Sequence, residues 1–245
     1  MWGKWIDCRV RPGAQDAFAD GQRRWAALVD QPGLVGQVGG WSGTEGRALV
    51  LSLWADEEAY GRFMRERHDG IATATGQQGS WTAVQVAAGP VAQPVPGAAG
   101  SLPDALKDAT LLRAADCRLR PGRTDHFLEV QRRVWSPGMA AAGGMLEGAV
   151  TRLAVDRYLV TTLWTSPQAY AAYTADAFPA LRARADVRAD VESLTGHVLP
   201  LEPAWQVLPQ RIHAGPRKAV EGSARSVKKV EAAGAVQALL GSADG

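Results

Sequence analysis

The sequence predicts an α+β protein built from two tandem ferredoxin-like repeats, which together form a pseudo-dimer of the dimeric α+β barrel type. The first observation is an internal repeat: residues 7–13 read DCRVRPG, and residues 116–122 read DCRLRPG. The second is the order of elements, because each copy is expected to run strand, helix, strand, strand, helix, strand, which is the ferredoxin-like order. Both predict helices on one face of an antiparallel sheet.

The first repeat is expected to open with a strand over residues 5–11, where apolar and polar side chains alternate. A Pro-Gly pair ends this strand. Residues 14–31 then predict an amphipathic helix, since their apolar side chains fall near one stripe. A second Pro-Gly pair at 32–33 stops the helix.

The rest of the first repeat is expected to contain three strands and a second helix. Residues 34–42 and 47–54 predict a hairpin around a Gly-rich turn. Asp56 is expected to cap a helix that runs to about residue 75, with His68 near its end. Residues 81–87 predict a short last strand.

The chain is expected to divide into residues 1–88, a Pro/Gly linker at 89–109, a second repeat at 110–209 and a mobile basic tail at 210–245. In the second repeat the pattern predicts helix and strand again, with Pro179 breaking a long helical region that reaches about residue 195. The final strand is placed at residues 205–208.

The simplest packing sets the two bare sheet faces against each other and leaves the helices outside. The alternating leucines Leu49, Leu51 and Leu53 are then expected to face the helices. The barrel interior is expected to be lined by Asp7, Arg9, Ser52, Trp54 and their counterparts Asp116, Arg118, Thr162 and Trp164.

Charge and apolar content limit the classes of partner. The net charge is +2, but the residues from 210 onward carry +3, which leaves −1 on the body and predicts no nucleic-acid surface. No apolar run reaches the roughly 18 residues of a membrane span, and the first residues lack a signal peptide's pattern. No membrane contact and a cytoplasmic location are therefore expected. Cys8 and Cys117 are expected to be buried free thiols, too few for a thiolate metal site.

Several short motifs of the first repeat are shared with a known family. They are KWIDC at 4–8, GQ at 21–22, Trp25, PGLVGQ at 32–37, GGWS at 39–42, Trp54, Tyr60, FM at 63–64 and HD at 68–69. Together they resemble the YdbC-type bacterial family over residues 2 to about 86. More broadly, both repeats resemble the antibiotic-biosynthesis monooxygenase group of dimeric α+β barrels. That resemblance implies a small ligand between a sheet and its helices, in enzymes ranging from cofactor-free oxygenases to haem degraders, or in proteins without catalysis.

The haem degraders of that group also carry an Asn on the first strand and a haem-ligating His late in the second helix. Here the corresponding positions hold Asp7 or Asp116 and, for the His, Thr73 or Arg182. None of these ligates iron as imidazole does. No cofactor is therefore expected.

Each candidate site residue has two interpretations. His68 could be a general base, because imidazole titrates near neutral pH, or a cation favoured at a helix end. Asp7 and Arg9 share a strand face, which favours structural ion pairs holding the halves together, with a substrate-gripping Arg as the alternative. Trp54 and Trp164 fit either a core or a site.

The resemblance favours a cofactor-independent oxygenase or cyclase of a small aromatic, polyketide-like substrate. His68 would remove a phenolic proton, and Arg9 or Trp54 would hold the anion. The other side chains expected to contact the substrate are Ser52, Trp41, Phe63, Tyr60, Arg118, Trp164, Thr162 and Tyr173. The alternatives are a non-catalytic binding or stress protein and a haem-binding protein. Because Phe178 stands at the position of His68, any chemistry is expected in the first repeat. Homodimerisation of the pseudo-dimer stays open.

Overall fold

The two copies of the repeated stretch form equivalent strands, β1 (Trp2–Val10) and β5 (Leu111–Leu119). They belong to a computed structural model that describes residues 1–43 and 46–209. In each strand alternate side chains are apolar, so one face can pack against helices. The tail at 210–245 lies outside the described residues.

The first half has the expected order of elements. After β1 come α1 (Gln15–Arg24), the 3-10 helix η1 (Trp25–Leu28), β2 (Leu34–Trp41), β3 (Arg47–Trp54), α2 (Glu57–Glu66), α3 (His68–Thr75) and β4 (Trp81–Val95). The Asp56 side chain accepts a hydrogen bond from the Ala59 backbone N–H at 2.8 Å, which confirms the predicted helix cap.

The second half repeats this order with more helical turns. Its elements are α4 (Leu102–Asp108), β5, α5 (Thr124–Val130), the π-helical turn η2 (Gln131–Trp135), α6 (Ser136–Ala140), β6 (Met145–Ala154), β7 (Arg157–Trp164), α7 (Pro167–Asp176), α8 (Phe178–Ala185), α9 (Val187–Asp190), β8 (Val191–Pro200) and the 3-10 helix η3 (Pro203–Trp205). The predicted α+β fold of two ferredoxin-like units is confirmed.

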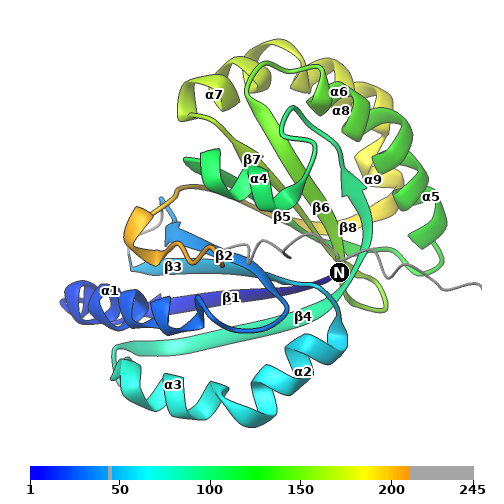
Figure 1. The fold of residues 1–245 in the computed structure, drawn as a ribbon. Coiled ribbons are helices and arrows are strands. Elements are labelled where there is room, and N and C mark those ends of the chain that lie inside the picture. The colour runs from blue at the N-terminus through cyan, green and yellow to red at the C-terminus, as the bar shows by residue number, and fades with distance from the viewer. Residues whose placement is uncertain (44–45, 210–245) are drawn as a thin grey trace, which may run out of the picture. The chain divides into compact units, whose positions relative to one another are not determined.

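All eight strands form one antiparallel sheet in the order β2-β3-β1-β4-β6-β7-β5-β8. The chain after β8 returns to the opposite edge, where Gln37 on β2 and Val207 exchange two backbone hydrogen bonds of 2.9 Å. In Figure 1, α2 and α3 lie beyond the strands of the first half, α5 to α8 lie beyond those of the second half, and α4 lies between the halves.

The stretch at 89–109, predicted as a linker, is structured instead. Strand β4 pairs with β1 up to Pro90 and with β6 from Val91 onward, so it joins the two halves of the sheet. Each part of β4 pairs with one neighbour, which leaves positions where a proline without an N–H is tolerated. Helix α4 then buries Leu102, Ala105 and Leu106 in a core between the halves.

The predicted orientation of the strand faces was wrong for residues 47–54, whereas Asp7 shares the face between the halves as predicted. Leu49, Leu51 and Leu53 lie in the core between the halves, together with leucines of β7. Ser52 and Trp54 occupy the opposite face, where Trp54 packs against α2 and η1. The alternation of side chains shows which residues share a face of a strand, but not what that face packs against. The leucine face packs partly against α4, which lies outside both repeats as the sequence defined them.

The last strand also differs from the prediction. It is β8 (Val191–Pro200), whereas Trp205 lies in η3 and Val207 forms one isolated bridge. The helix break expected at Pro179 occurs, but an equivalent break separates α2 from α3, where the chain has no proline. The break is therefore a property of the repeat. Within the described ranges no helix is long and apolar enough to cross a membrane.

Candidate functional site

A cavity of about 510 Å³ lies between the outer face of the first-half sheet and helices α1, α2 and α3. Its apolar wall includes Phe18, Trp25, Leu28, Trp54, Phe63 and Trp81. Its polar wall includes Lys4, Gln22, Gln37, Ser52, His68 and Gln77. Aromatic walls with a few polar groups are typical of small-molecule sites, and the volume falls in their range of roughly 300–1,000 Å³.

An aromatic stack forms one side of the cavity. Trp54 is fully buried and stacks on Phe63, with ring centroids 4.8 Å apart and an interplanar angle of 22°. The indole N–H of Trp54 donates to the Ser52 hydroxyl at 3.2 Å. Tyr60 lies behind this stack, 5.8 Å from the Trp54 ring, rather than in the cavity wall.

His68 stands at the break between α2 and α3 and is the first residue of α3, so it lies at a helix N-terminus rather than near the C-terminal end of one long helix. Its ring lies 5.7 Å from Phe63 and 5.8 Å from Trp25, measured between centroids. Nδ1 lies 2.8 Å from the Asp69 carboxylate, and the imidazole side chain is 24% exposed. The ring is therefore held in the wall of the cavity by aromatic contacts and by one carboxylate.

Sequence-based prediction missed Lys4. This lysine is 6% exposed, and its Nζ lies 3.8 Å from the Met64 sulfur and 5.8 Å from the centre of the Tyr60 ring. Burial lowers the pKa of Lys4 to about 8. The signal was present in the sequence, because the alternation of β1 places Lys4 on the same face as Ile6 and Cys8.

Gln37 was also missed as a site residue, although it is the last residue of the PGLVGQ motif at 32–37. It is 4% exposed, and its side-chain nitrogen is buried without a hydrogen-bond partner. Gln77, by contrast, has partners at both of its side-chain polar atoms. The Gln77 nitrogen donates to the Phe18 carbonyl at 2.9 Å and to Gln22 at 3.2 Å, and its oxygen accepts from the Trp25 indole at 3.0 Å.

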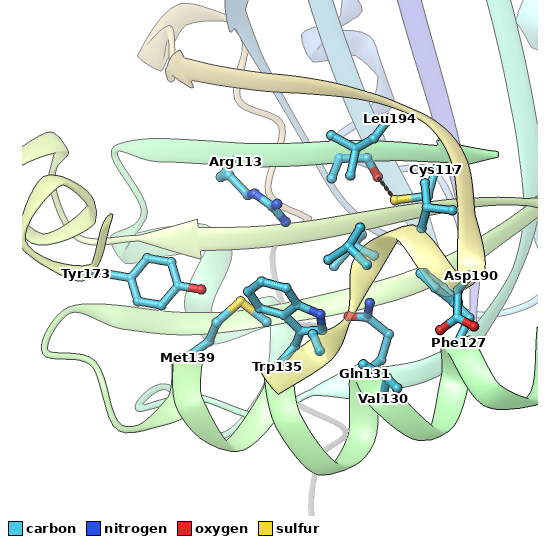
Figure 2. A pocket seen from close by; sticks show the side chains of 15 residues that line it. Arg113, Cys117, Phe127, Val130, Gln131, Trp135, Met139, Tyr173, Asp190 and Leu194 are labelled. Carbon is cyan, nitrogen blue, oxygen red and sulfur yellow. Dashed lines mark hydrogen bonds between the residues drawn. The ribbon is translucent and has the colours of Figure 1, made fainter. Parts of the chain in front are cut away.

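The equivalent space in the second half is nearly filled, with about 50 Å³ remaining. Arg113 replaces Lys4 there. Helical structure continues through η2 and α6, and Figure 2 shows Trp135 and Met139 extending from this helical segment toward Arg113, with Tyr173 beside them. In the first half α1 and η1 end at Leu28, so only the end of α6, which carries Met139, has no helical counterpart there. Met139 therefore contributes to filling the space in the second half.

The structure brings together four of the predicted site residues, His68, Trp54, Ser52 and Phe63, in the first-half cavity. Trp41 lies elsewhere, against Phe18 and Trp205 at 5.7 and 5.2 Å. In the second half, the fully buried Trp164 donates to Thr162 at 2.9 Å. Tyr173 lines the residual space, and Arg118 is exposed.

Asp7 and Arg9 lie on the sheet face opposite the cavity. Asp7 pairs with Arg47 rather than with Arg9, which is exposed. The equivalent pair is Asp116 and Arg157. Asp116 and, more weakly, Asp7 raise the pKa of Arg157. The two ion pairs therefore interact electrostatically between the halves.

His197 is buried beside these ion pairs. It is 6% exposed, and its ring lies 6.2 Å from that of Trp5. Burial and the Arg47 charge lower the pKa of His197. The cysteines behave as predicted: Cys8 and Cys117 are free and buried, and burial raises the pKa of each thiol to about 12.

The fit to haem is poor. Thr73 lies in the cavity wall at the position where the haem degraders carry their ligating His, and a Thr hydroxyl does not replace imidazole. Asp7, at the position of their first-strand Asn, faces away from the cavity. Among residues 1–43 and 46–209, no group of three His, Cys, Asp or Glu side chains is arranged to hold a metal ion.

Residues 3–88 match the model of a family described as a domain of unknown function, DUF4937. YdbC of Bacillus subtilis (strain 168), described as an uncharacterized protein, is 34% identical over 82 residues, which cover 32% of this chain and 69% of YdbC. The family match falls on the half that contains the cavity.

Solved structures resemble both halves together. A proposed monooxygenase from Fusobacterium nucleatum aligns with a TM-score of 0.66 at 11% identity, over 82% of this chain and 91% of that one. One from Lactobacillus acidophilus aligns with a TM-score of 0.63 at 10% identity, over 84% and 95%. An anthrone oxidase-like protein gives 0.61 at 15% identity, over 82% and 91%. At such identities the likeness shows the fold, which is that of monooxygenase-like ferredoxin-fold proteins.

Proposed function

The chain belongs to the YdbC family, and we propose that its first-half cavity binds a small hydroxylated aromatic molecule and promotes its oxidation by O₂ without a cofactor. The observation that carries this proposal is the asymmetry of the two halves. One half encloses about 510 Å³ beside His68, whereas the other retains about 50 Å³ and has Phe178 at the position of His68. A cavity kept open in one repeat and filled in the other favours a ligand site over a packing defect.

The cavity residues suit an aromatic substrate. The half-buried rings of Trp25 and Trp81 offer flat apolar surfaces, and the buried Trp54–Phe63 stack supports the wall beside His68. Rings prefer offset or edge-to-face contact with such side chains. The similarity in fold to an anthrone oxidase-like protein agrees with a polycyclic substrate.

The chemistry assigned to His68 is removal of a proton from the substrate, as a general base. The resulting aromatic anion is electron-rich and reduces O₂ directly. One oxygen atom forms a new carbonyl on the ring, and the other leaves as water with the two hydrogens of the oxidised carbon, so a methylene plus O₂ gives a ketone plus water. The protein contributes position, deprotonation and exclusion of water.

Oxygen uptake with anthrone and with dihydroxynaphthalenes tests this proposal. Wild-type protein is expected to accelerate uptake and to place one ¹⁸O atom from ¹⁸O₂ in the ketone product of anthrone, as read by mass spectrometry. Trp164→Phe, which changes the filled half, serves as the matched control for Trp54→Phe. Binding of these molecules without oxygen uptake would contradict a catalytic role and favour a binding protein. A ring-closed product formed without O₂ would indicate a cyclase instead.

A further inference from the structure

We propose that Lys4, Ser52 and Gln37 form a row of hydrogen-bond donors that binds an anionic oxygen of the aromatic ligand, either a carboxylate or a phenolate. This inference rests on the proposed function, because it specifies which chemical class the same cavity accepts. It also moves the anion-holding role from Arg9, which the sequence suggested, to a lysine on the other face of the same strand.

The register of the sheet places the three residues side by side. Lys4 on β1 pairs with Ser52 on β3, and Gln37 on β2 pairs with the same Ser52 from the other side. Residues paired across adjacent strands project from one face with Cβ atoms about 4.5–5.5 Å apart. All three side chains line the cavity, and each is less than 10% exposed.

The three side chains carry more hydrogen-bond donors than the protein provides acceptors for. The Gln37 nitrogen is buried without a partner, and the Ser52 oxygen accepts from the Trp54 indole, which leaves the Ser52 hydroxyl proton to be donated. The Lys4 ammonium has as its neighbours a thioether sulfur and an aromatic ring, which are weak acceptors. Because buried donors are costly when unpaired, the missing group is an acceptor oxygen.

The missing group is also negatively charged, because Lys4 has no counter-charge. Within the described residues no carboxylate lies in salt-bridge distance of its Nζ, and an unpaired buried charge is costly. Burial raises the pKa of the nearby Tyr60 and Cys8, to about 12 for Cys8, so neither supplies an anion near neutral pH. Asp69 lies at the cavity rim, is 97% exposed and contacts His68. An anionic ligand would supply the negative charge that the Lys4 ammonium lacks within the protein.

The second half provides a natural comparison. The positions that correspond to Lys4, Ser52 and Gln37 are Arg113, Thr162 and Gly148, and the space beside them is filled. The row of donors is therefore incomplete where the cavity is closed, since glycine has no side-chain donor.

The test is calorimetric titration of the full-length protein with 2-naphthoate and with its neutral analogue 2-naphthamide. The corresponding carboxylates and amides of benzene and anthracene are titrated as well, to vary the ring size. Wild-type protein is expected to prefer the carboxylate. Lys4→Met should weaken carboxylate binding by about 10–100-fold, the value of a hydrogen bond to a charged group, with little change for the amide. Gln37→Leu should weaken it by about 3–10-fold. Arg113→Met is the matched control and should bind as wild type does.

The pH dependence adds a second readout. The carboxylate ligand stays ionised throughout, whereas Lys4 loses its proton as the pH rises past about 8. Carboxylate affinity should therefore fall above that pH in wild type but not in Lys4→Met. Met is close to Lys in length and apolar, so the variant should fold, and thermal unfolding checks this.

The outcomes separate the two proposals. Equal affinity for carboxylates and amides, unchanged by Lys4→Met or by Lys4→Gln, would overturn the anion inference and leave an aromatic site. If no ligand of any ring size binds, either as the carboxylate or as the amide, the proposed function of the cavity is contradicted as well.

Discussion

The carboxylate of Asp7 accepts two hydrogen bonds from Arg47, at 2.9 and 2.5 Å, on the face of the sheet opposite the cavity. The same two-point contact recurs between Asp116 and Arg157 at 3.0 and 2.6 Å. Such paired contacts combine charge with fixed geometry. Their position between the halves, away from His68, favours a structural role.

We expect Asp7→Asn to lower the free energy of unfolding by about 1–3 kcal/mol, toward the lower end because the Arg47 side chain is 33% exposed. Asp20→Asn, which breaks an exposed pair with Arg23, should change it by less than about 1 kcal/mol. Urea unfolding measures both. If Asp7→Asn abolished ligand binding at unchanged stability, the pair would belong to the site.

His197 should make stability depend on pH. Its pKa is lower in the folded protein than in the unfolded chain, so the folded state resists protonation. Its contribution to stability is therefore complete above about pH 6.5, the unfolded value, and declines as the pH falls below that value. Asp7 and Asp116 oppose the shift, and burial and Arg47 outweigh them. His197→Asn should show a shallower loss of melting temperature between pH 7 and 5. An unchanged slope would assign the dependence to other groups.

Helix α4 should be a structural part of the fold. Leu106 is fully buried in the core between the halves, so Leu106→Ala should lower the free energy of unfolding by about 2–5 kcal/mol. Val155→Ala, at a side chain that is 81% exposed, is the control and should be close to neutral. A neutral Leu106→Ala would support the original interpretation of residues 89–109 as a linker.

The sequence predicted the elements of each repeat well because their signals are local. Alternation in β1, the Asp56 cap and the Pro-Gly stops each act within a few residues. Contacts between the repeats were predicted only in part: Asp7 forms an ion pair on the face between the halves, but the cover of the leucine face was missed. The alternation of Leu49 and Leu51 could not show that a helix from residues 89–109 would cover their face. The last strand was misplaced because the side chains over much of β8 are exposed and polar, with little apolar alternation.

The candidate site was predicted in part for the same reason. Trp54 and His68 carry family motifs, and both line the cavity. Lys4 was visible as a charge on an apolar strand face, but its isolation from carboxylates depends on α2 and α3. The filling of the second-half space by Trp135 follows the π-helical turn η2, which the sequence pattern does not reveal.

His68 should control turnover if the cavity is catalytic. His68→Gln retains polarity without a titrating ring, and loss of a general base lowers rates by about 10²–10⁴-fold. Trp164→Phe should retain the wild-type rate. A rate in His68→Gln within a few-fold of wild type would remove His68 from the mechanism.

The location of the ligand is the central claim, and ¹⁹F NMR of protein labelled with 5-fluorotryptophan tests it most directly. Trp25, Trp54 and Trp81 line the first-half cavity, whereas Trp135 lines the residual space of the second half and Trp5 lies between the halves. Single Trp→Phe variants assign the resonances. Titration with 2-naphthoate should shift the signals of Trp25, Trp54 and Trp81 and leave those of Trp135 and Trp5 in place. Shifts confined to Trp135 or Trp5 would place the ligand elsewhere and contradict the account.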